Sequence, residues 1–257
     1  MHARLCRLSS NTAVAAVTFV FAVGATITMF TGCVADPPMP ADTAMIESVG
    51  VLAGAGRQGS ALRQLERWSE LGSVIATREL ALAYQHYPER AASARAALKQ
   101  AARSGDSVAA FMLGESAHRQ ATSPVDLHTA WCWYEMAAER NHAEAALMLG
   151  RMAANGEGHS VDVELSMAWL ERAARLHNPQ AMFLLFSYFT RAEAGEAQWP
   201  RARDLLDASA DRHYPPAMHA MALALETGQF GFERSATQAA LLMKEASEES
   251  RNRWGAR

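Results

Sequence analysis

The stretch AEAALMLGRMAANGEGHSVDVELSMAWLERAARLHN, residues 143–178, decides the fold because its pattern recurs along the chain. A segment that starts inside it at Trp169 has relatives that start 36 residues earlier, at Trp133, and 36 residues later, at Leu205. A further copy starts at Leu241. Small residues keep the same step: Ala109, Ala145, Ala181 and Ala217. Self-similarity at a fixed period of this length is the signature of a repeat architecture.

Each repeat is predicted to form two helices. Ala145 and Leu149 belong to a series of apolar or small residues at helical spacing in the first segment, and Trp169 and Ala173 belong to a similar series in the second. Asn178, followed by a proline, is a favourable helix start, because a capping side chain precedes a residue suited to the first helical position.

The physical consequence is a stack of helix pairs. One pair cannot bury both of its faces, whereas stacked pairs can, so the predicted class is all-α and the predicted architecture is an α-solenoid of antiparallel pairs. We expect capping helices in residues 43–72, about five helix pairs in residues 73–249 and a C-terminal tail in residues 250–257.

The repeat resembles a known family, the Sel-one-like repeat, whose members form tetratricopeptide-like α-solenoids. The resemblance covers roughly residues 73–249 and is best in residues 143–178. It rests on small and Leu-Gly positions in the first helix, a Gly-x-Gly loop, an aspartate, and a tryptophan and an Ala-Ala pair in the second helix. The matching residues are Ala145, Leu149, Gly150, Gly156, Gly158, Asp162, Trp169, Ala173 and Ala174.

The resemblance also implies where a partner binds. In tetratricopeptide-like solenoids the first helices of successive pairs line the concave surface. The implied groove residues are Glu115, His118, Arg119, Arg151, Asn155, Ser187, Arg191, His219 and Glu226. Three of them are arginines, which form bidentate pairs with carboxylates, so the set suits an extended peptide or an acidic partner segment. An ordinary solvated helix face is the alternative interpretation.

Composition argues against a nucleic-acid partner. The chain has 257 residues, half of them apolar and a fifth charged, with a formal net charge of −3. Nucleic-acid binding needs a concentrated basic face, and no run of like charge is present in the sequence.

The N-terminal segment resembles the signal of a bacterial lipoprotein. Arg4 and Arg7 precede an apolar stretch that ends in FTGC at Cys33, which predicts a secretory signal peptide over residues 1–32. FTGC is similar to a lipobox, and this resemblance implies that Cys33 is acylated. A tether over residues 33–42 would then hold the protein at a bacterial membrane, in our interpretation the outer membrane facing the periplasm. An uncleaved signal anchor is the alternative.

The cysteine count follows from that interpretation. Signal cleavage removes Cys6 and acylation uses Cys33, which leaves Cys132 as the only other cysteine. We therefore expect no disulfide in the mature chain, and we expect Cys132 to be a small buried residue of a helix.

The loop AANGEGHSVD, residues 153–162, allows three interpretations. A phosphate-binding loop needs glycines that lead directly into a helix N-terminus, normally after a strand, and a helix precedes them here. A hydrolytic cluster of His159, Ser160 and Asp162 is disfavoured because neighbours on one loop rarely reach catalytic geometry. Asp126 stands 36 residues before Asp162. This recurrence favours a turn in which the aspartate starts the second helix, so we expect no catalytic residues.

No metal site or cofactor is expected either. His177 and His213 are one repeat apart, so they should lie on successive layers, on the order of 10 Å from each other, which is too far for shared ligation. The sequence holds no His-x-x-x-His or Cys-x-x-Cys pattern.

These observations favour a non-catalytic scaffold that binds a partner protein of the bacterial cell envelope through the solenoid surface. Two other functions stay open at this point. One is a glycan-binding accessory of polysaccharide export or cell-wall remodelling. The other is an envelope hydrolase that acts on wall precursors or β-lactams.

Overall fold

The computed structural model describes residues 42–55, 59–191 and 195–254. Every regular element in these ranges is a helix, which confirms the predicted all-α class. The longer helices are α1 (Thr43–Gly54), α2 (Gly59–Glu70), α3 (Val74–Tyr84), α4 (Ala91–Arg103), α5 (Ser107–Gln120), α6 (Pro124–Glu139), α7 (Ala143–Asn155), α8 (Val163–Arg175), α9 (Pro179–Phe189), α10 (Trp199–Ala210), α11 (Pro215–Thr227) and α12 (Ala236–Trp254). The short 3-10 helices are η1 (Pro88–Arg90), η3 (Glu196–Gln198) and η4 (Gln229–Gly231).

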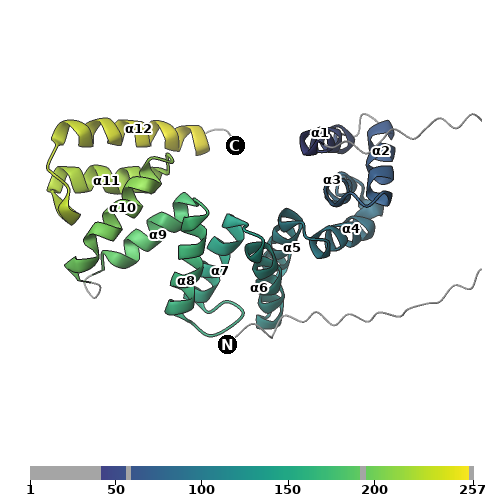
Figure 1. Cartoon of the computed structure of the whole chain (residues 1–257), viewed down its shortest axis with the longest axis horizontal. Coiled ribbons are helices and arrows are strands. Elements are labelled where there is room, and N and C mark those ends of the chain that lie inside the picture. The colour runs from purple at the N-terminus through teal and green to yellow at the C-terminus, as the bar shows by residue number, and fades with distance from the viewer. Residues whose placement is uncertain (1–41, 56–58, 192–194, 255–257) are drawn as a thin grey trace, which may run out of the picture.

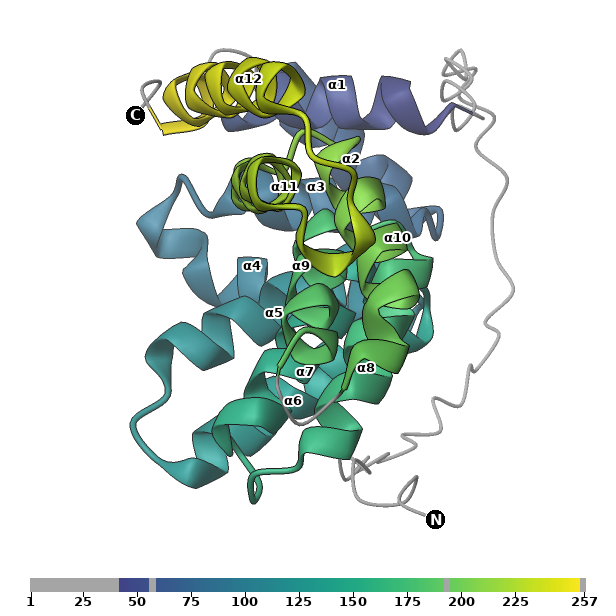
Figure 2. The same ribbon diagram turned by 90° about the vertical axis from the view of Figure 1, so that its left-hand side faces the viewer.

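From α3 onward the helices form successive pairs that stack on one another: α3–α4, α5–α6, α7–α8, α9–α10 and α11–α12. Figure 1 shows the stack as an open arc, with α3, α5, α7 and α9 towards its inside and α4, α6, α8 and α10 towards its outside. Figure 2 shows the same arc from the end at which α11 and α12 lie. This arrangement is the predicted α-solenoid.

The turn from one pair to the next has the same backbone conformation in each copy. One residue after each outer helix takes a positive φ angle: Gly72, Gly105, Asn141, His177 and His213. Glycine, asparagine and histidine are all enriched in this left-handed region. The recurrence of His177 and His213 therefore has a backbone explanation, because both residues occupy the turn that connects two layers.

In four of these five turns the side chain of the following residue caps the next inner helix, whereas Tyr214 makes no side-chain cap. The capping side chain accepts a hydrogen bond from the backbone N–H three residues on, and that N–H belongs each time to an alanine that is 0% exposed. The cap and alanine pairs are Ser73 with Ala76, Asp106 with Ala109, His142 with Ala145, and Asn178 with Ala181. The cap fixes where the inner helix begins, and the buried alanine lets neighbouring layers approach closely.

The cap residue also contacts the inner helix of the preceding pair. Asp106 Oδ2 accepts from Arg78 Nη1 at 3.1 Å, and Asn178 Nδ2 donates to Glu144 Oε2 at 2.9 Å. In two other instances the contact is between rings, with centroids 4.5 Å apart for Phe111 and His142 and 5.8 Å apart for Phe183 and Tyr214. The same repeat position thus joins successive layers by an ion pair, a hydrogen bond or ring packing.

Arg78 lies in a buried ion cluster that joins α1, α3 and α5. Its guanidinium lies 2.7 Å from Glu47, 2.9 Å from Glu79 and 3.1 Å from Asp106. Burial raises the pKa of Glu79, and the hydrogen bond from Arg78 opposes that rise. One cation therefore bonds to three carboxylates, of which Glu79 and Asp106 are buried and Glu47 is exposed.

Glycines set the distance between the inner and outer helix of a pair. A Cβ atom on Gly114 would lie 2.6 Å from Cδ1 of Tyr134, and one on Gly150 would lie 2.8 Å from Cγ of Leu170. The outer helix therefore inserts a large side chain directly against the backbone of the inner helix. This contact explains the Leu-Gly positions of the repeat in physical terms, since real Cβ atoms do not tolerate such distances.

The loop over residues 153–162 is a turn, as predicted. Gly156 ends α7 with a φ of 73°, and Gly158 has a φ of 81°. A Cβ on Gly158 would lie 3.0 Å from the backbone nitrogen of His128, so this glycine packs against α6. Asp162 caps α8, because its Oδ1 accepts from the Leu165 N–H at 2.9 Å.

Asp126 and Asp162 hold different positions in their helices, although the sequence placed them at equivalent positions. Helix α6 begins earlier in its repeat than α8, and its cap is Ser123, whose Oγ accepts from the Asp126 N–H at 3.2 Å. The Asp126 carboxylate in turn accepts from the Ser123 N–H at 3.1 Å. Asp126 is thus the third helical residue of a capping box and not the cap itself.

Cys132 is buried in α6 with 8% of its surface exposed, as predicted. The chain has three cysteines, and Cys6 and Cys33 lie outside the described residues. The expectation that the mature chain holds no disulfide therefore stays a prediction.

We predict that Gly156→Val destabilises the fold. Valine at a φ of 73° is strained, and its Cβ would lie 3.0 Å from Cγ2 of Val161, so we expect a loss of about 1–3 kcal/mol in the free energy of unfolding. Urea denaturation followed by circular dichroism measures it. Gly156→Asn is the matched control, because asparagine accepts this conformation; equal stability of the valine variant and the natural chain would contradict the prediction.

We predict that Arg78→Met destabilises the fold at pH 7 by about 3–5 kcal/mol, because it leaves buried carboxylates without their cation. Without Arg78 the folded-state pKa of Glu79 rises further above its unfolded value, so the folded state binds more protons. Stability of the variant should therefore increase as the pH falls from 7 to 5. Urea denaturation at several pH values tests this. The exposed Arg95→Met on α4 is the control, and a variant that loses stability on acidification would contradict the argument.

Candidate partner-binding surface

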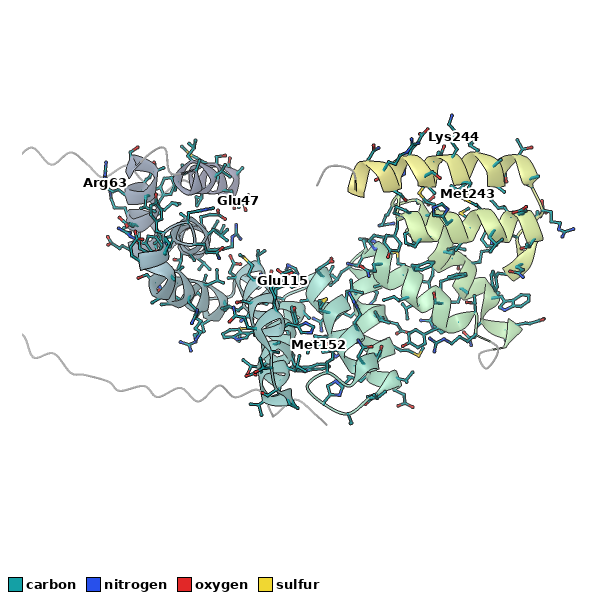
Figure 3. All side chains as sticks on the ribbon, turned by 180° about the vertical axis from the view of Figure 1, so that it is seen from behind. Glu47, Arg63, Glu115, Met152, Met243 and Lys244 are labelled. Carbon is teal, nitrogen blue, oxygen red and sulfur yellow. The ribbon has the colours of Figure 1, made fainter. Side chains whose placement is uncertain are left out.

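Eight of the nine predicted groove residues lie on the inner helices α5, α7, α9 and α11, and Arg191 lies directly after α9. Figure 3 shows Glu115 projecting from α5 towards the inside of the arc. His118, Ser187 and His219 are half-buried. The exposed members are Glu115, Arg119, Arg151, Asn155, Arg191 and Glu226.

The structure brings three of these residues together around one pocket. Glu115, His118 and Arg119 line a depression of about 380 Å³ that is open to solvent. Tyr134 from the outer helix α6 and Met148 from the inner helix α7 complete its lining. The pocket therefore spans two adjacent repeats.

Tyr134 forms the buried part of this pocket, and sequence reasoning missed it. Only 1% of its surface is exposed, and its ring reaches the inner surface because Gly114 has no side chain in its way. Burial, and next the charge of Glu115, raise the pKa of Tyr134 above its usual range. Its hydroxyl makes no hydrogen bond to any described residue. The signal was in the sequence, since one and two repeats later the same position holds Leu170 and Leu206.

A hydrogen-bonded group closes one side of the pocket. His118 Nε2 lies 2.8 Å from Glu157 Oε2, and Asn155 Nδ2 donates to Glu157 Oε1 at 2.8 Å. Glu157 follows α7, so its contact with His118 ties the end of α7 to α5 of the preceding pair, whereas its bond with Asn155 is local. His118 thus helps to hold two layers together, and Asn155 orients the Glu157 carboxylate.

Three charged side chains near the pocket are not bonded to another described side chain. Glu115, Arg119 and Arg151 make no ion pair or side-chain hydrogen bond within the described ranges. Arg119 and Arg151 are close enough to Tyr134 to lower its pKa, against the larger opposite effects of burial and Glu115. The inner surface of these two repeats therefore presents two guanidinium groups, one carboxylate and one phenol to an incoming molecule.

The other predicted groove residues do not reach this pocket. Ser187 Oγ donates to the Phe183 carbonyl at 3.0 Å. The Arg191 guanidinium lies over the Tyr188 ring, 4.6 Å from its centroid. His219 Nδ1 lies 2.9 Å from Met243 Sδ, a contact between α11 and α12 in the part of the arc that Figure 3 shows near the Met243 label. Glu226 lies near the end of α11.

The loop residues considered for catalysis make structural contacts. The Asp162 carboxylate caps α8, and His159 Nδ1 contacts the backbone carbonyl of Ser160. The His159 ring also meets the Trp131 ring edge-on, with centroids 4.4 Å apart. The three side chains therefore do not form a serine–histidine–aspartate relay, which needs the base in hydrogen-bond reach of the hydroxyl. No group of three or more metal-ligating side chains occurs in the described part of the chain.

Comparison with known proteins gives the repeat a name. The Sel1 repeat family model matches residues 107–142, 143–178 and 215–250. The matched ranges include α5–α6, α7–α8 and α11–α12, whereas α9–α10, in which Phe186 replaces the packing glycine, is not matched. A search of curated proteins finds no sequence match.

Several solved structures share the fold. A Sel1 repeat protein from Oxalobacter formigenes superposes with a TM-score of 0.68 at 18% identity, over 80% of this chain and 88% of that one. A protective antigen of uropathogenic Escherichia coli with an SLR fold gives 0.64 at 20% identity, over 81% of this chain and 46% of that one. The immunity protein PA5088 from Pseudomonas aeruginosa gives 0.52 at 14% identity, over 83% and 84%.

The family match and the fold agree with each other. The matched repeats each contain one inner and one outer helix of the arc, joined by the capped turns described above. The chain is therefore an α-solenoid, and three of its helix pairs are similar to the Sel1 repeat.

Proposed function

We propose that this protein is a non-catalytic scaffold of the bacterial cell envelope that binds a partner protein through the inside of its arc. The observation that carries the proposal is the pocket between α5 and α7, which Glu115 and Arg119 line next to the buried Tyr134. Neither charged group makes an ion pair or side-chain hydrogen bond to a described residue, and Arg151 lies exposed on the same side of α7 as part of the predicted groove. Charged groups on a stable fold normally pair internally or face solvent singly. Their gathering at a concave place favours recognition of another molecule.

The arc supports binding of an extended partner. Successive inner helices present side chains at the repeat spacing, so a segment of a partner chain can contact several layers at once. The connections between layers are capped and packed, which keeps these side chains at fixed positions before binding. A pre-organised surface loses less conformational entropy on association.

We further propose that the protein is a lipoprotein acylated at Cys33, with its body facing the periplasm at the outer membrane. The support is the lipobox-like FTGC and the short tether over residues 33–42. Directly after the tether, α1 exposes Met45, Val51 and Leu52 by 53%, 71% and 45%. Such an apolar face is compatible with a position next to lipid. Among the described residues, no helix has the length and apolar character needed to cross a membrane.

We expect the double variant Arg119→Ala with Arg151→Ala to lose its partner. Pull-down of the tagged full chain from detergent-solubilised envelope, read by quantitative mass spectrometry, should recover a specific protein that this variant binds at least 10-fold more weakly. Loss of a charge-assisted hydrogen bond costs about 1.5–3 kcal/mol, which corresponds to such a factor.

The matched control removes two exposed arginines from outer helices, Arg95→Ala on α4 with Arg175→Ala on α8. If both double variants recover the same partners in equal amounts, the inner surface is not the binding site. Specific recovery of peptidoglycan or exopolysaccharide in place of a protein would contradict the scaffold function and favour glycan binding.

Acylation is tested separately. Mass spectrometry of the mature N-terminus should show a lipid on Cys33, and Cys33→Ser should abolish it and release the protein from membranes. Non-reducing peptide mapping provides the opposite outcome, because a disulfide between Cys33 and Cys132 would occupy the thiol that acylation needs. A Cys33→Ser variant that still carries lipid would also contradict the proposal.

A further inference from the structure

We infer that the exposed face of α1 lies in the interface of a phospholipid membrane and forms a second membrane contact besides the proposed lipid on Cys33. This face consists of Ala44, Met45, Ser48, Val51 and Leu52. The inference rests on the proposed function, because it takes the membrane of the proposed lipoprotein as the partner and names the part of the folded chain that touches it.

The exposed face of α1 is apolar and carries no charge. Met45, Val51 and Leu52 are 53%, 71% and 45% exposed. Met45 and Leu52 are seven residues apart, as are Ala44 and Val51, so the four side chains lie on one side of the helix. Ser48, the polar member of the face, donates its hydroxyl to the Ala44 carbonyl at 2.7 Å. Its donor is therefore satisfied within the helix, and the whole face can enter an apolar environment.

The carboxylates next to this face are bonded within the protein. Asp42 Oδ1 accepts from the Ala44 N–H at 2.9 Å as the cap of α1. The Glu47 carboxylate lies 2.7 Å from the Arg78 guanidinium. A membrane contact at the exposed face therefore does not require α1 to bury an unpaired charge, which would be costly.

The two ends of the arc, where α1 and α12 lie in Figure 1, differ in the polarity of their outer surfaces. A stacked array of helix pairs normally closes with a polar surface. At the C-terminal end, Gln238 and Glu245 are exposed on α12. Their counterparts 36 residues earlier, Ala202 and Ser209, are 0% exposed in α10. Polar side chains thus replace small ones where no further layer follows, whereas the exposed face of α1 stays apolar and fits lipid better than water.

The length of chain before α1 favours a membrane over other apolar partners. Cys33 and Thr43, the first residue of α1, are ten residues apart, a distance of about 35 Å at full extension. An acyl group on Cys33 therefore keeps α1 next to lipid. A tethered contact forms at high effective concentration, whereas a second copy or another protein must first be met by diffusion. A helix with one apolar face at such a place lies in the plane of the interface, with its apolar side chains among the lipid.

The experiment uses the full chain in nanodiscs of phosphatidylcholine and phosphatidylglycerol that hold a single copy, treated with hydrogen peroxide and analysed by peptide mass spectrometry. Met45 reports on α1, and Met243 on α12 is the internal reference. The protein itself exposes Met45 by 53% and Met243 by 39%. Peroxide oxidises the methionines that water reaches, so we nevertheless expect Met45 to react about 5-fold more slowly than Met243.

The variant Val51→Glu with Leu52→Glu should abolish this protection, because charged side chains leave the interface. We expect its Met45 rate, relative to Met243, to rise about 5-fold. Both positions are exposed, so the variant should fold, and circular dichroism checks this. Val161→Glu with Val163→Glu is the matched control, since these valines are 63% and 50% exposed far from α1 in the chain, and it should leave Met45 protected.

A Met45 rate that is equal in the natural chain and in the Val51→Glu, Leu52→Glu variant would overturn the inference. Protection that appears only when two chains share a nanodisc would also overturn it and assign the face to a second copy. Acylation is read separately from the mass of the N-terminus. Lipid on Cys33 together with an unprotected Met45 would contradict the membrane contact of α1 and leave the lipoprotein proposal intact.

Discussion

The contact on which the rest of the structure depends is the one between a glycine of the inner helix and a large side chain of the outer helix. At Gly114 and Gly150 no Cβ atom fits, because the ring of Tyr134 and the side chain of Leu170 already lie there. This contact holds the helices of a pair together at close range. It also carries the end of an outer-helix side chain to the inner surface, so the identity of that side chain can change the surface without changing the fold.

A second constraint fixes the position of each helix pair relative to the preceding one. It is the turn that joins one pair to the next. A left-handed residue is followed by a cap, and the cap contacts the inner helix of the preceding pair, as Asp106 does with Arg78 and His142 does with Phe111. The same geometry thus accepts an ion pair or a pair of rings. In the ionic contact, Arg78 also bonds to Glu47 and so holds α1.

The sequence was sufficient for the fold because the fold is periodic. A step of 36 residues identifies equivalent positions, and the small residue Ala145 or the cap Asn178 then has the same role as its counterparts. Periodicity was misleading where one copy departs from the others: α6 begins earlier than α8, so Asp126 and Asp162 have different positions in their helices.

The candidate site was also predictable only where the repeat register applies. Register alone placed Glu115, His118 and Arg119 on the inner surface, because surface positions recur with the helix period, and all three line the pocket. It could not place Tyr134, since a residue of an outer helix is expected in the core. In a repeat protein, equivalent positions that are leucine in other copies serve packing. A polar group at such a position has no packing reason to be there, and departures of this kind are where recognition by a repeat protein should be sought.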